Sequence, residues 1–410
     1  MDQKRIMIIG GRWSPEPFVQ AAKQLNCWVL TTHYDPHLKN ILGADEVYFV
    51  HPRNLVILFD LFIKHQINAV VHDGDDNALI AAGILCKKFD LPGPQQSSVA
   101  FSTNKGGLRT FCDRLKIPQP KFFIGTTIRD LRNGIDHIGG FPVVIKPIDS
   151  QWGQGITKIE NETEIHDALT NALEHSIAER FIVEKFVEGT VVVVEGYSFT
   201  PTNHTVLAVS SKRIRDKKRL LTAELVYPAE SEEVLQNKAV VLHQKLIKAL
   251  GYNFGFSHSE FVAGLNGEVL LLESANRGAA FFISSRILPA LTEIKLLDFY
   301  IKSAIGISSR EFPLNIPQQK VVALFSTFQF KKGKIKKIIG LKDAQSLPGV
   351  LALDLFHREG EYIYDSQRHG YMAITLETMR ETRAREQEIR SLVSLTYQNN
   401  FLRTVKDLLV

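Results

Sequence analysis

The chain has 410 residues and a formal net charge of +5, and 44% of its residues are hydrophobic. This length is too great for one hydrophobic core and predicts two or three domains. So small a charge does not indicate nucleic acid, and no apolar run approaches the roughly 20 residues that cross a bilayer. The three cysteines are widely spaced and no signal-like segment opens the sequence, so we expect a protein of the reducing cytoplasm.

The first hundred residues alternate short apolar strands with a helical pattern, which is typical of a parallel α/β sheet. The strands are expected at 6–9, 28–31 and 69–71, with a helix at 17–25. Gly10 and Gly11 end the first strand, where open α/β sheets bind ligands, but they form no GxGxxG fingerprint. The turn signal Pro92-Gly93-Pro94 predicts that this N-terminal domain covers residues 1–102.

A second unit with further strands and helices is expected over residues 103–312, and a β-rich subdomain with a terminal helix over 313–410. The fold class predicted for the whole chain is therefore α/β and α+β. Two basic runs, 212–219 and 331–337, lack the interleaved aromatic residues that bind single-stranded nucleic acid, and we interpret the second run as a solvated face.

The segment 256–277 predicts two carboxylates facing each other across a β-hairpin. Asn266-Gly267 indicates a two-residue turn in which Leu265 pairs with Glu268, and counting outward places Glu260 opposite Glu273. Such side chains lie about 5 Å apart at Cβ and repel, so a positive charge is expected between them. Carboxylates at this spacing suit Mg²⁺ better than they suit a solvated face, because Glu273 ends an apolar run.

Two lysines are candidates for binding phosphate. Lys146 ends the apolar strand 143–146 and precedes a loop that carries Gly153 and Gly155, where an ammonium and backbone N–H groups can meet a triphosphate. Lys105 opens a predicted helix, and a helix N-terminus favours anions. Taken alone, each lysine is more often a surface residue.

The order of these motifs resembles the ATP-grasp superfamily, in which two lobes clamp a nucleotide. Lys105 in STNKGG and Lys146 in FPVVIK match its two phosphate-binding lysines, and Arg277 matches the arginine that follows the second metal-binding glutamate. Glu260 and Glu273 match the two metal-binding glutamates. The resemblance implies ATP with Mg²⁺, Mn²⁺ being the alternative ion, a flexible lid lobe at about 121–187 and a hinge near 184–189. Implied cofactor contacts are Lys105, Lys146, Gly153, Gly155, Glu184, Lys185, Phe186, Val187 and Glu188.

The same resemblance, to the biotin carboxylase and amino-acid ligase branch, implies a carboxylate–amine ligase. Such an enzyme phosphorylates a substrate carboxylate to an acylphosphate, and an amine then displaces the phosphate to form an amide or peptide bond. Arg277 and Lys146 would be its catalytic residues, Lys212 is a weaker candidate for the anionic site, and His258 is interpreted as a neighbour of Glu260 only. The alternatives are a carboxylase acting through carboxyphosphate and a non-catalytic nucleotide-binding module.

Two positions depart from the family pattern. Val191 stands where many members carry the acidic residue that binds ribose, so this role falls to Glu188 or Glu195. Ala275 replaces an asparagine of the second metal motif, which leaves open whether Asn276 substitutes and whether one ion or two bind.

The expected partners are a small-molecule carboxylate and amine, with no nucleic acid or membrane, and a homodimer is the default for an enzyme of this kind. Residues 151–153 are expected to form a lid over the triphosphate. The run 278–282 suggests an apolar part of the substrate pocket.

Overall fold

The computed structural model describes residues 3–11, 15–38, 41–200, 203–280, 282–307, 316, 321–364 and 368–398. Contacts divide the chain into two compact units, Met1–Lys320 and Val321–Val410. The predicted boundary at residue 313 lies outside the described residues, as does Phe281 of the predicted apolar run. Among the helices described, none is long and apolar enough to cross a membrane.

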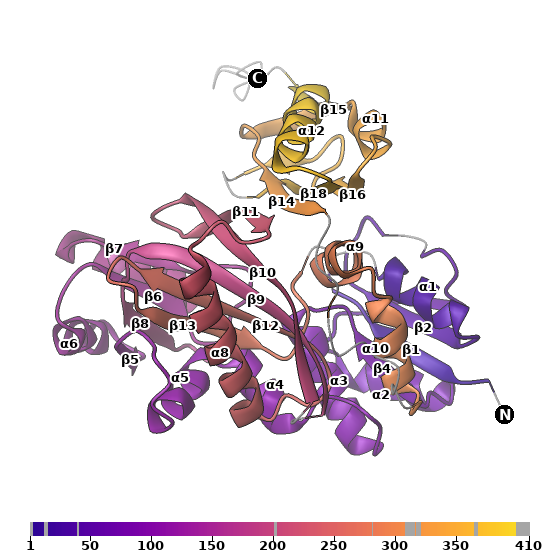
Figure 1. Cartoon of the computed structure of the whole chain (residues 1–410), viewed down its shortest axis with the longest axis horizontal. Coiled ribbons are helices and arrows are strands. Elements are labelled where there is room, and N and C mark those ends of the chain that lie inside the picture. Colours follow the sequence, from indigo (N-terminus) through magenta and orange to yellow (C-terminus); the bar gives the residue numbers. More distant parts are fainter. Residues whose placement is uncertain are drawn as a thin grey trace, which may run out of the picture. The chain divides into compact units, whose positions relative to one another are not determined.

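The chain begins with a parallel four-stranded sheet in the order β3-β2-β1-β4, as predicted (Figure 1). Both faces of this sheet are covered. Helices α2 and α3 share a core with Met7 and Val70, and α1 and α10 (Leu296–Ala304) pack on the opposite face. The elements are β1 (Arg5–Ile9), α1 (Glu16–Gln24), β2 (Trp28–His33), β3 (Glu46–Phe49), α2 (Leu55–Lys64), β4 (Ala69–His72) and α3 (Asp76–Lys88).

An antiparallel sheet in the order β5-β8-β6-β7 lies in the segment 121–187 that was predicted to be a lid lobe. Its strands are β5 (Phe122–Gly125), β6 (Val143–Pro147), β7 (Thr157–Ile159) and β8 (Phe181–Lys185), and α6 (Ile128–Ile138), η1 (Glu162–Glu164) and α7 (Ile165–Glu174) complete the lobe. Ile145 and Val183 pack against α6 and α7. Because side chains alternate along a strand, Lys146 and Glu184 lie on the other face.

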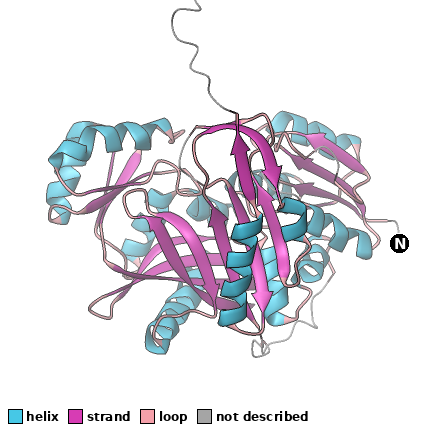
Figure 2. Ribbon diagram, turned by 90° about the horizontal axis from the view of Figure 1, so that it is seen from above, coloured by secondary structure: helices cyan, strands magenta, loops and turns pink. Residues whose placement is uncertain are grey.

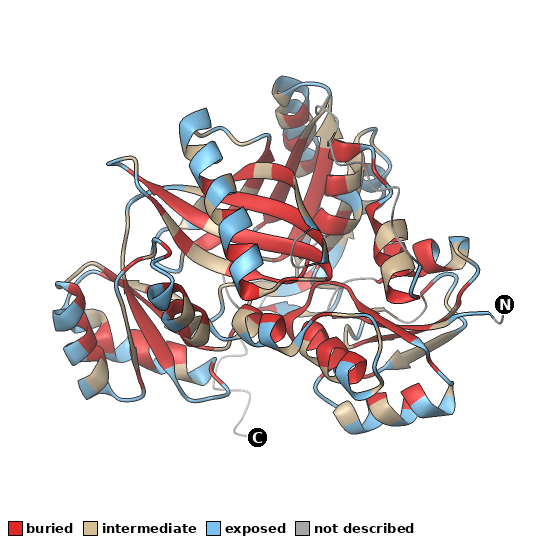
Figure 3. Ribbon diagram, turned by 60° about the horizontal axis from the view of Figure 1, so that its bottom comes forward, coloured by how far each residue is buried: buried red, intermediate tan, exposed pale blue. Residues whose placement is uncertain are grey.

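Within the first unit, five antiparallel strands follow the order β13-β12-β9-β10-β11 (Figure 2). Their bounds are β9 (Gly189–Thr200), β10 (Asn203–Asp216), β11 (Leu221–Tyr227), β12 (Gly255–Gly264) and β13 (Val269–Ala275). One face packs on α4 (Gln96–Thr103), α5 (Lys105–Arg114) and α8 (Glu233–Leu250) around Val192, Val194 and Phe261. Figure 3 shows these central strands as buried. The opposite face carries Glu260 and Glu273.

After β13 the first unit continues with η2 (Ile283–Ile287), α9 (Leu288–Thr292) and α10 (Leu296–Ala304). The second unit is β-rich, as predicted, with one sheet in the order β14-β18-β16 and another in the order β17-β15-β19. Its elements are β14 (Val322–Phe328), β15 (Gly333–Ile339), α11 (Leu341–Gln345), β16 (Val350–Leu355), β17 (Tyr362–Ile363), β18 (Gly370–Leu376), α12 (Met379–Leu392) and β19 (Ser394–Tyr397). A capping box of Thr378 and Glu381 begins α12.

Candidate active site

The structure pairs Glu260 with Glu273 across the β12–β13 hairpin, as predicted. The predicted two-residue turn is wrong, because the Gly264 N–H donates to the Glu268 carbonyl at 2.9 Å and three residues close the loop. Gly267 takes the left-handed position, with φ 77°, that such a three-residue turn requires. The register then shifts between Glu260 and Phe261, and Leu272 becomes an extra residue in β13. The shift at the turn and the bulge cancel, so the two carboxylates still face each other.

Cations from the chain itself surround Glu260. The Lys212 ammonium on β10 lies 2.7 and 2.8 Å from its two carboxylate oxygens, and His258 Nε2 lies 3.3 Å from one of them. Burial disfavours the charged carboxylate, but Lys212 and His258 outweigh it and hold the pKa of Glu260 below its ordinary value. The positive charge expected beside the carboxylate pair is therefore present, and Lys212 is one of its sources.

His258 connects Glu260 to a second carboxylate. Its Nδ1 lies 2.9 Å from Oε1 of Glu195, which is fully buried. Burial lowers the basicity of the imidazole, but Glu195 and Glu260 together raise the pKa of His258 to about 9. Of the two residues predicted to bind ribose, Glu195 is thus engaged by His258, whereas Glu188 is exposed just before β9.

Arg277 follows β13 and is held by the N-terminal domain. Its Nε donates to Oδ1 of Asp76 at the start of α3, and its Nη2 lies 4.0 Å from Glu273 Oε1. Burial opposes ionisation of Glu273, yet Lys105 and Arg277 hold the pKa of this carboxyl below its ordinary value. Arg277, Lys105 and Glu273 thus form one charged group, and Asp76 fixes the arginine within it.

The side-chain amide nitrogen of Asn276 is used within the protein. Its side-chain amide donates to the carbonyls of Phe254 and Phe256, at 2.9 and 3.0 Å, where it braces the beginning of β12. Since residues next to each other in a strand point to opposite faces, the face of Glu273 is shared by Ala275 and not by Asn276. The residues described therefore offer two carboxylates at this site.

Lys105 lies at the first position of α5. Asn104 caps this helix by accepting a hydrogen bond from the Gly107 N–H at 2.8 Å. The Lys105 ammonium donates to the carbonyl of Ser150 at 2.5 Å, which ties the helix to the loop after β6. The predicted lysine and the predicted glycine-containing loop are therefore adjacent.

The loop after β6 is also docked onto α3. The Gln151 side chain accepts from the Asp76 N–H at 2.9 Å and donates to Asp75 Oδ2 at 3.0 Å. Gly153 and Gly155 have φ values of 75° and 72°. A Cβ at Gly155 would lie 2.5 Å from Cγ of Pro147, so both the backbone and the space require glycine there.

Lys146 lies beside the hinge carboxylate. Its ammonium is 2.5 Å from Oε2 of Glu184, and Nε of Arg109 is 2.6 Å from Oε1 of the same carboxylate. Burial alone would raise the pKa of Glu184, but Arg109 and Lys146 lower it to about 2. The Glu184 side chain is thus held by cations of the chain, so a contact with a nucleotide at this residue would use its backbone.

Lys185 and Phe186, the next residues of the predicted hinge, have other partners than Glu184 has. The Lys185 ammonium turns to the carbonyls of Gly140 and Phe141, at 2.9 and 3.1 Å, and away from Lys146. The backbone N–H of Lys185 donates to the carbonyl of Lys121 at 2.9 Å, and that of Phe186 donates to the carbonyl of Pro142 at 3.2 Å. Val187 and Glu188 complete the segment before β9. Within the hinge, these two N–H groups are therefore already used inside the protein.

Sequence reasoning did not single out Arg109. Asp76 stood out only as part of the polar turn 72–76 that follows a strand, and Gln151 only as part of the loop tip 151–153 that was expected to cover the triphosphate. Arg109 lies four residues after Lys105 and so on the same side of α5, a spacing that could have linked it to the site. Asp76 belongs to an acidic turn whose partner, Arg277, is 201 positions away, which no local pattern reveals. Gln151 carried no signal beyond its place in the loop.

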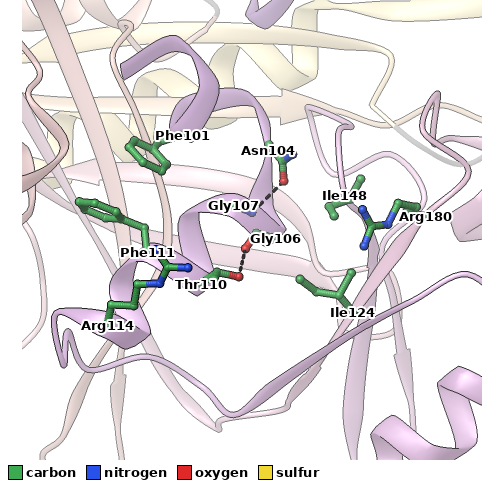
Figure 4. A pocket seen from close by; sticks show the side chains of 10 residues that line it. All are labelled: Phe101, Asn104, Gly106, Gly107, Thr110, Phe111, Arg114, Ile124, Ile148 and Arg180. Carbon is green, nitrogen blue, oxygen red and sulfur yellow. Dashed lines mark hydrogen bonds between the residues drawn. The ribbon is translucent and has the colours of Figure 1, made fainter. Parts of the chain in front are cut away.

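A hollow of about 400 Å³ lies on another side of α5 (Figure 4). The side chains of Arg114 and Arg180 flank it, and the rings of Phe101 and Phe111 lie 4.5 Å apart along one wall. Its remaining lining residues are Asn104, Gly106, Gly107, Thr110, Ile124 and Ile148. Lys105 and Arg109 do not line it, so the hollow is separate from the charged groups described above.

The donor set fits a magnesium ion that is shared with phosphate. In the described part of the chain, no group of three or more His, Cys, Asp or Glu side chains could enclose a metal by itself. Mg²⁺ commonly uses one or two carboxylates together with water and substrate phosphates. Glu260 and Glu273 supply such a pair, and Lys105 and Lys146 supply cations for the phosphates.

Comparisons with known proteins identify the kind of domain that this part of the chain forms. Residues 139–285 match the model of the ATP-grasp domain. An L-arginine-specific L-amino acid ligase of Bacillus subtilis is 23% identical over 432 residues, which cover 98% of both chains. A formate-dependent phosphoribosylglycinamide formyltransferase of Saccharolobus solfataricus is 25% identical over 308 residues, which cover 73% of this chain and 74% of the relative.

The solved structure of an L-amino acid ligase from Bacillus licheniformis superposes with a TM-score of 0.83, at 19% identity, over 97% of this chain and 100% of that one. The fold is thus that of an N-terminal α/β domain, a two-lobed ATP-grasp domain and a β-rich C-terminal extension. Residues 139–285 are thus similar to the ATP-grasp domain, as the sequence motifs predicted. Among the proteins compared, the chain resembles the carboxylate–amine ligases.

Proposed function

We propose that the protein is an ATP-dependent ligase that joins a carboxylate to an amine through an acylphosphate, releasing ADP and phosphate. The observation that carries this proposal is the pairing of Glu260 with Glu273 across one hairpin, with Arg277 and Lys105 beside the second carboxylate. Phosphoryl transfer needs little covalent help from a protein, but it requires neutralised charge and fixed positions. These residues supply both.

Lys105 and Lys146 would bind the phosphates of ATP, and Glu260 with Glu273 would hold Mg²⁺. The ion would neutralise charge on the transferring phosphoryl group. The loop with Gly153 and Gly155 would cover the phosphates, an expectation supported by its hydrogen bond to Lys105 through Ser150. The backbone of residues 184–188 would contact adenine through groups other than the N–H of Lys185 and of Phe186, which are used within the protein. Glu188 would bind the ribose.

Arg277 would hold the substrate carboxylate or the oxyanion formed when the amine attacks. A guanidinium suits both because it presents several N–H groups in one plane. Asp76 accepts from its Nε, Nη1 donates to the carbonyl of Gly278 at 3.4 Å, and Nη2 lies on the side of Glu273. This anchoring supports a role in orienting the substrate.

The substrate is proposed to be an amino acid. The relative named as an L-arginine-specific L-amino acid ligase aligns over 98% of both chains, whereas the formyltransferase aligns over 73% of this one. Carboxylation through carboxyphosphate remains the second candidate, because formyltransferase and carboxylase chemistry also activates a small carboxylate on ATP.

The test is phosphate release from ATP and Mg²⁺ in the presence of pooled amino acids, with mass spectrometry of the products and a parallel series in Mn²⁺. We expect a product whose mass equals the sum of two pool members less one water. Glu273→Gln should abolish its formation, whereas Glu162→Gln, at an exposed ion pair of the lid lobe, should not. Release that needs only bicarbonate would instead establish carboxylation, and ATP binding without release in any pool would contradict the ligase assignment.

A further inference from the structure

Arg109 is a buried arginine that joins β8 to the β12–β13 hairpin. Only 1% of its surface is exposed. Its Nε donates to Glu184 on β8 at 2.6 Å, and its Nη2 donates to the carbonyl of Leu272 at 2.8 Å. Leu272 is the extra residue of the β13 bulge, next to Glu273. One guanidinium therefore contacts both sides of the candidate site.

The charges around Glu184 do not balance one to one. A single buried carboxylate faces two cations, the Arg109 guanidinium and the Lys146 ammonium. Buried charges are stable only when they are paired and hydrogen-bonded. Arg109 alone satisfies this requirement for Glu184, so Lys146 can leave the carboxylate without stranding it. If Arg109 were absent, Lys146 would be the only counter-ion left.

We propose that Arg109 is a positioning residue that makes Lys146 available to an anionic ligand by serving as the permanent counter-ion of Glu184. This inference rests on the proposed function, in which Lys146 binds the phosphates of ATP. Arg109 itself touches neither nucleotide nor metal. It acts through Glu184, and its second hydrogen bond fixes the Leu272 bulge that sets the register of Glu273.

The proposal predicts whether Lys146 is held by Glu184 or released in each of three variants. In Arg109→Met, Glu184 keeps Lys146 as a partner, so the fold survives but the lysine is held in a neutral pair. In Arg109→Met/Glu184→Gln no buried carboxylate remains, and Lys146 is released. Arg109→Lys restores a counter-ion for Glu184, although one ammonium is a poorer match to two separated acceptors.

The experiment measures the dissociation constant of ATP with Mg²⁺ by calorimetry for the wild type, the three variants and Arg132→Met. Arg132 pairs with Glu162 at 2.9 Å on the exposed surface of the lobe that contains Glu184, so it controls for loss of an arginine–glutamate pair. Thermal unfolding of each variant, read by circular dichroism, checks that the fold is retained.

We expect Arg109→Met to weaken ATP binding roughly ten- to hundredfold, the effect of losing one hydrogen bond to a charged group. The double variant should recover most of that loss, Arg109→Lys should recover part of it, and Arg132→Met should bind as the wild type does. Unchanged binding in Arg109→Met, or a double variant that binds no better than the single one, would overturn the inference. A wild type that binds no ATP would refute the proposed function itself.

Discussion

A pair of buried histidines predicts how the first unit responds to acid. His204 on β10 and His243 on α8 face each other on the helix-covered side of the large sheet, with their Nε2 atoms 3.0 Å apart. Ser198 lies 2.9 Å from Nδ1 of His204, and Ser259 lies 2.9 Å from Nδ1 of His243. Each ring is thereby held as a neutral imidazole that shares one hydrogen bond with the other.

Protonation of this pair is costly because the charge would be buried. Burial lowers the pKa of His204 from 6.5 to about 4, and burial together with His204 and His258 lowers the pKa of His243 well below 6.5. A histidine with a depressed pKa stabilises the fold fully above its unfolded value, and that contribution is lost as the pH falls. For His204, the fall to about 4 corresponds to about 3 kcal/mol, lost between pH 6.5 and pH 4.

The assay compares His204→Gln with the wild type by urea unfolding at several pH values in that window. Glutamine can still hydrogen-bond but does not titrate, so the variant should lose about 3 kcal/mol less than the wild type on acidification. His166→Gln is the matched control, since the His166 side chain on α7 is 81% exposed. It should follow the wild type throughout.

A parallel acid loss in His204→Gln and the wild type would refute the reasoning, because it would show that His204 is not held neutral by its surroundings. A large loss of stability in the variant already at neutral pH would show instead that the imidazole is needed for packing.

Three further predictions follow from particular contacts. Gly155→Ala should lower the unfolding free energy by about 2 kcal/mol or more, whereas Gly139→Ala, with φ 93° but nothing within 4 Å of its added Cβ, should cost less in the same thermal melt. Leu271→Ala, at a fully buried position of β13, should cost about 3 kcal/mol in urea unfolding; a change below about 1 kcal/mol would contradict its place in the core. Glu260→Gln should remove Mg²⁺-dependent ATP turnover while leaving the fold intact, and retained turnover in a phosphate-release assay would remove Glu260 from the proposed metal site.

The sequence predicted the features of the hairpin that depend on local periodicity. Apolar alternation and the Asn266-Gly267 signal suffice to indicate two paired strands with Glu260 opposite Glu273. They do not distinguish a two-residue turn from a three-residue one, because Gly267 can take a positive φ in either. Nor do they reveal the bulge at Leu272, whose carbonyl is satisfied by Arg109 from a distant helix. The pairing of Glu260 with Glu273 was therefore predictable, but the turn type and the bulge that produce it were not.

In the rest of the site as well, local features were predictable and contacts between distant residues were not. The parallel N-terminal sheet follows from strands that alternate with helices, and Lys146 was recognisable at the end of its strand. The partners of these residues were not predictable, since Arg109 and Glu184 are 75 positions apart and Arg277 and Asp76 are 201 apart. Such contacts form only when the N-terminal domain, lid lobe and central sheet have been brought together.

Ion pairs between residues far apart in the sequence are the main feature of the site. Lys212 is paired with Glu260 and Lys146 with Glu184, each through contacts of 2.5 to 2.8 Å. A polyphosphate and a divalent cation suit such a site. The polyphosphate can replace a carboxylate as the partner of a lysine, and the cation can replace a lysine as the partner of a carboxylate. Under the proposed function, the lysines would turn to anionic groups of the ligands while Glu260 would turn to the metal, and no buried charge would be left alone. Ligand binding would then be an exchange of ion pairs, in which neither ligand alone would satisfy all the groups that it displaces.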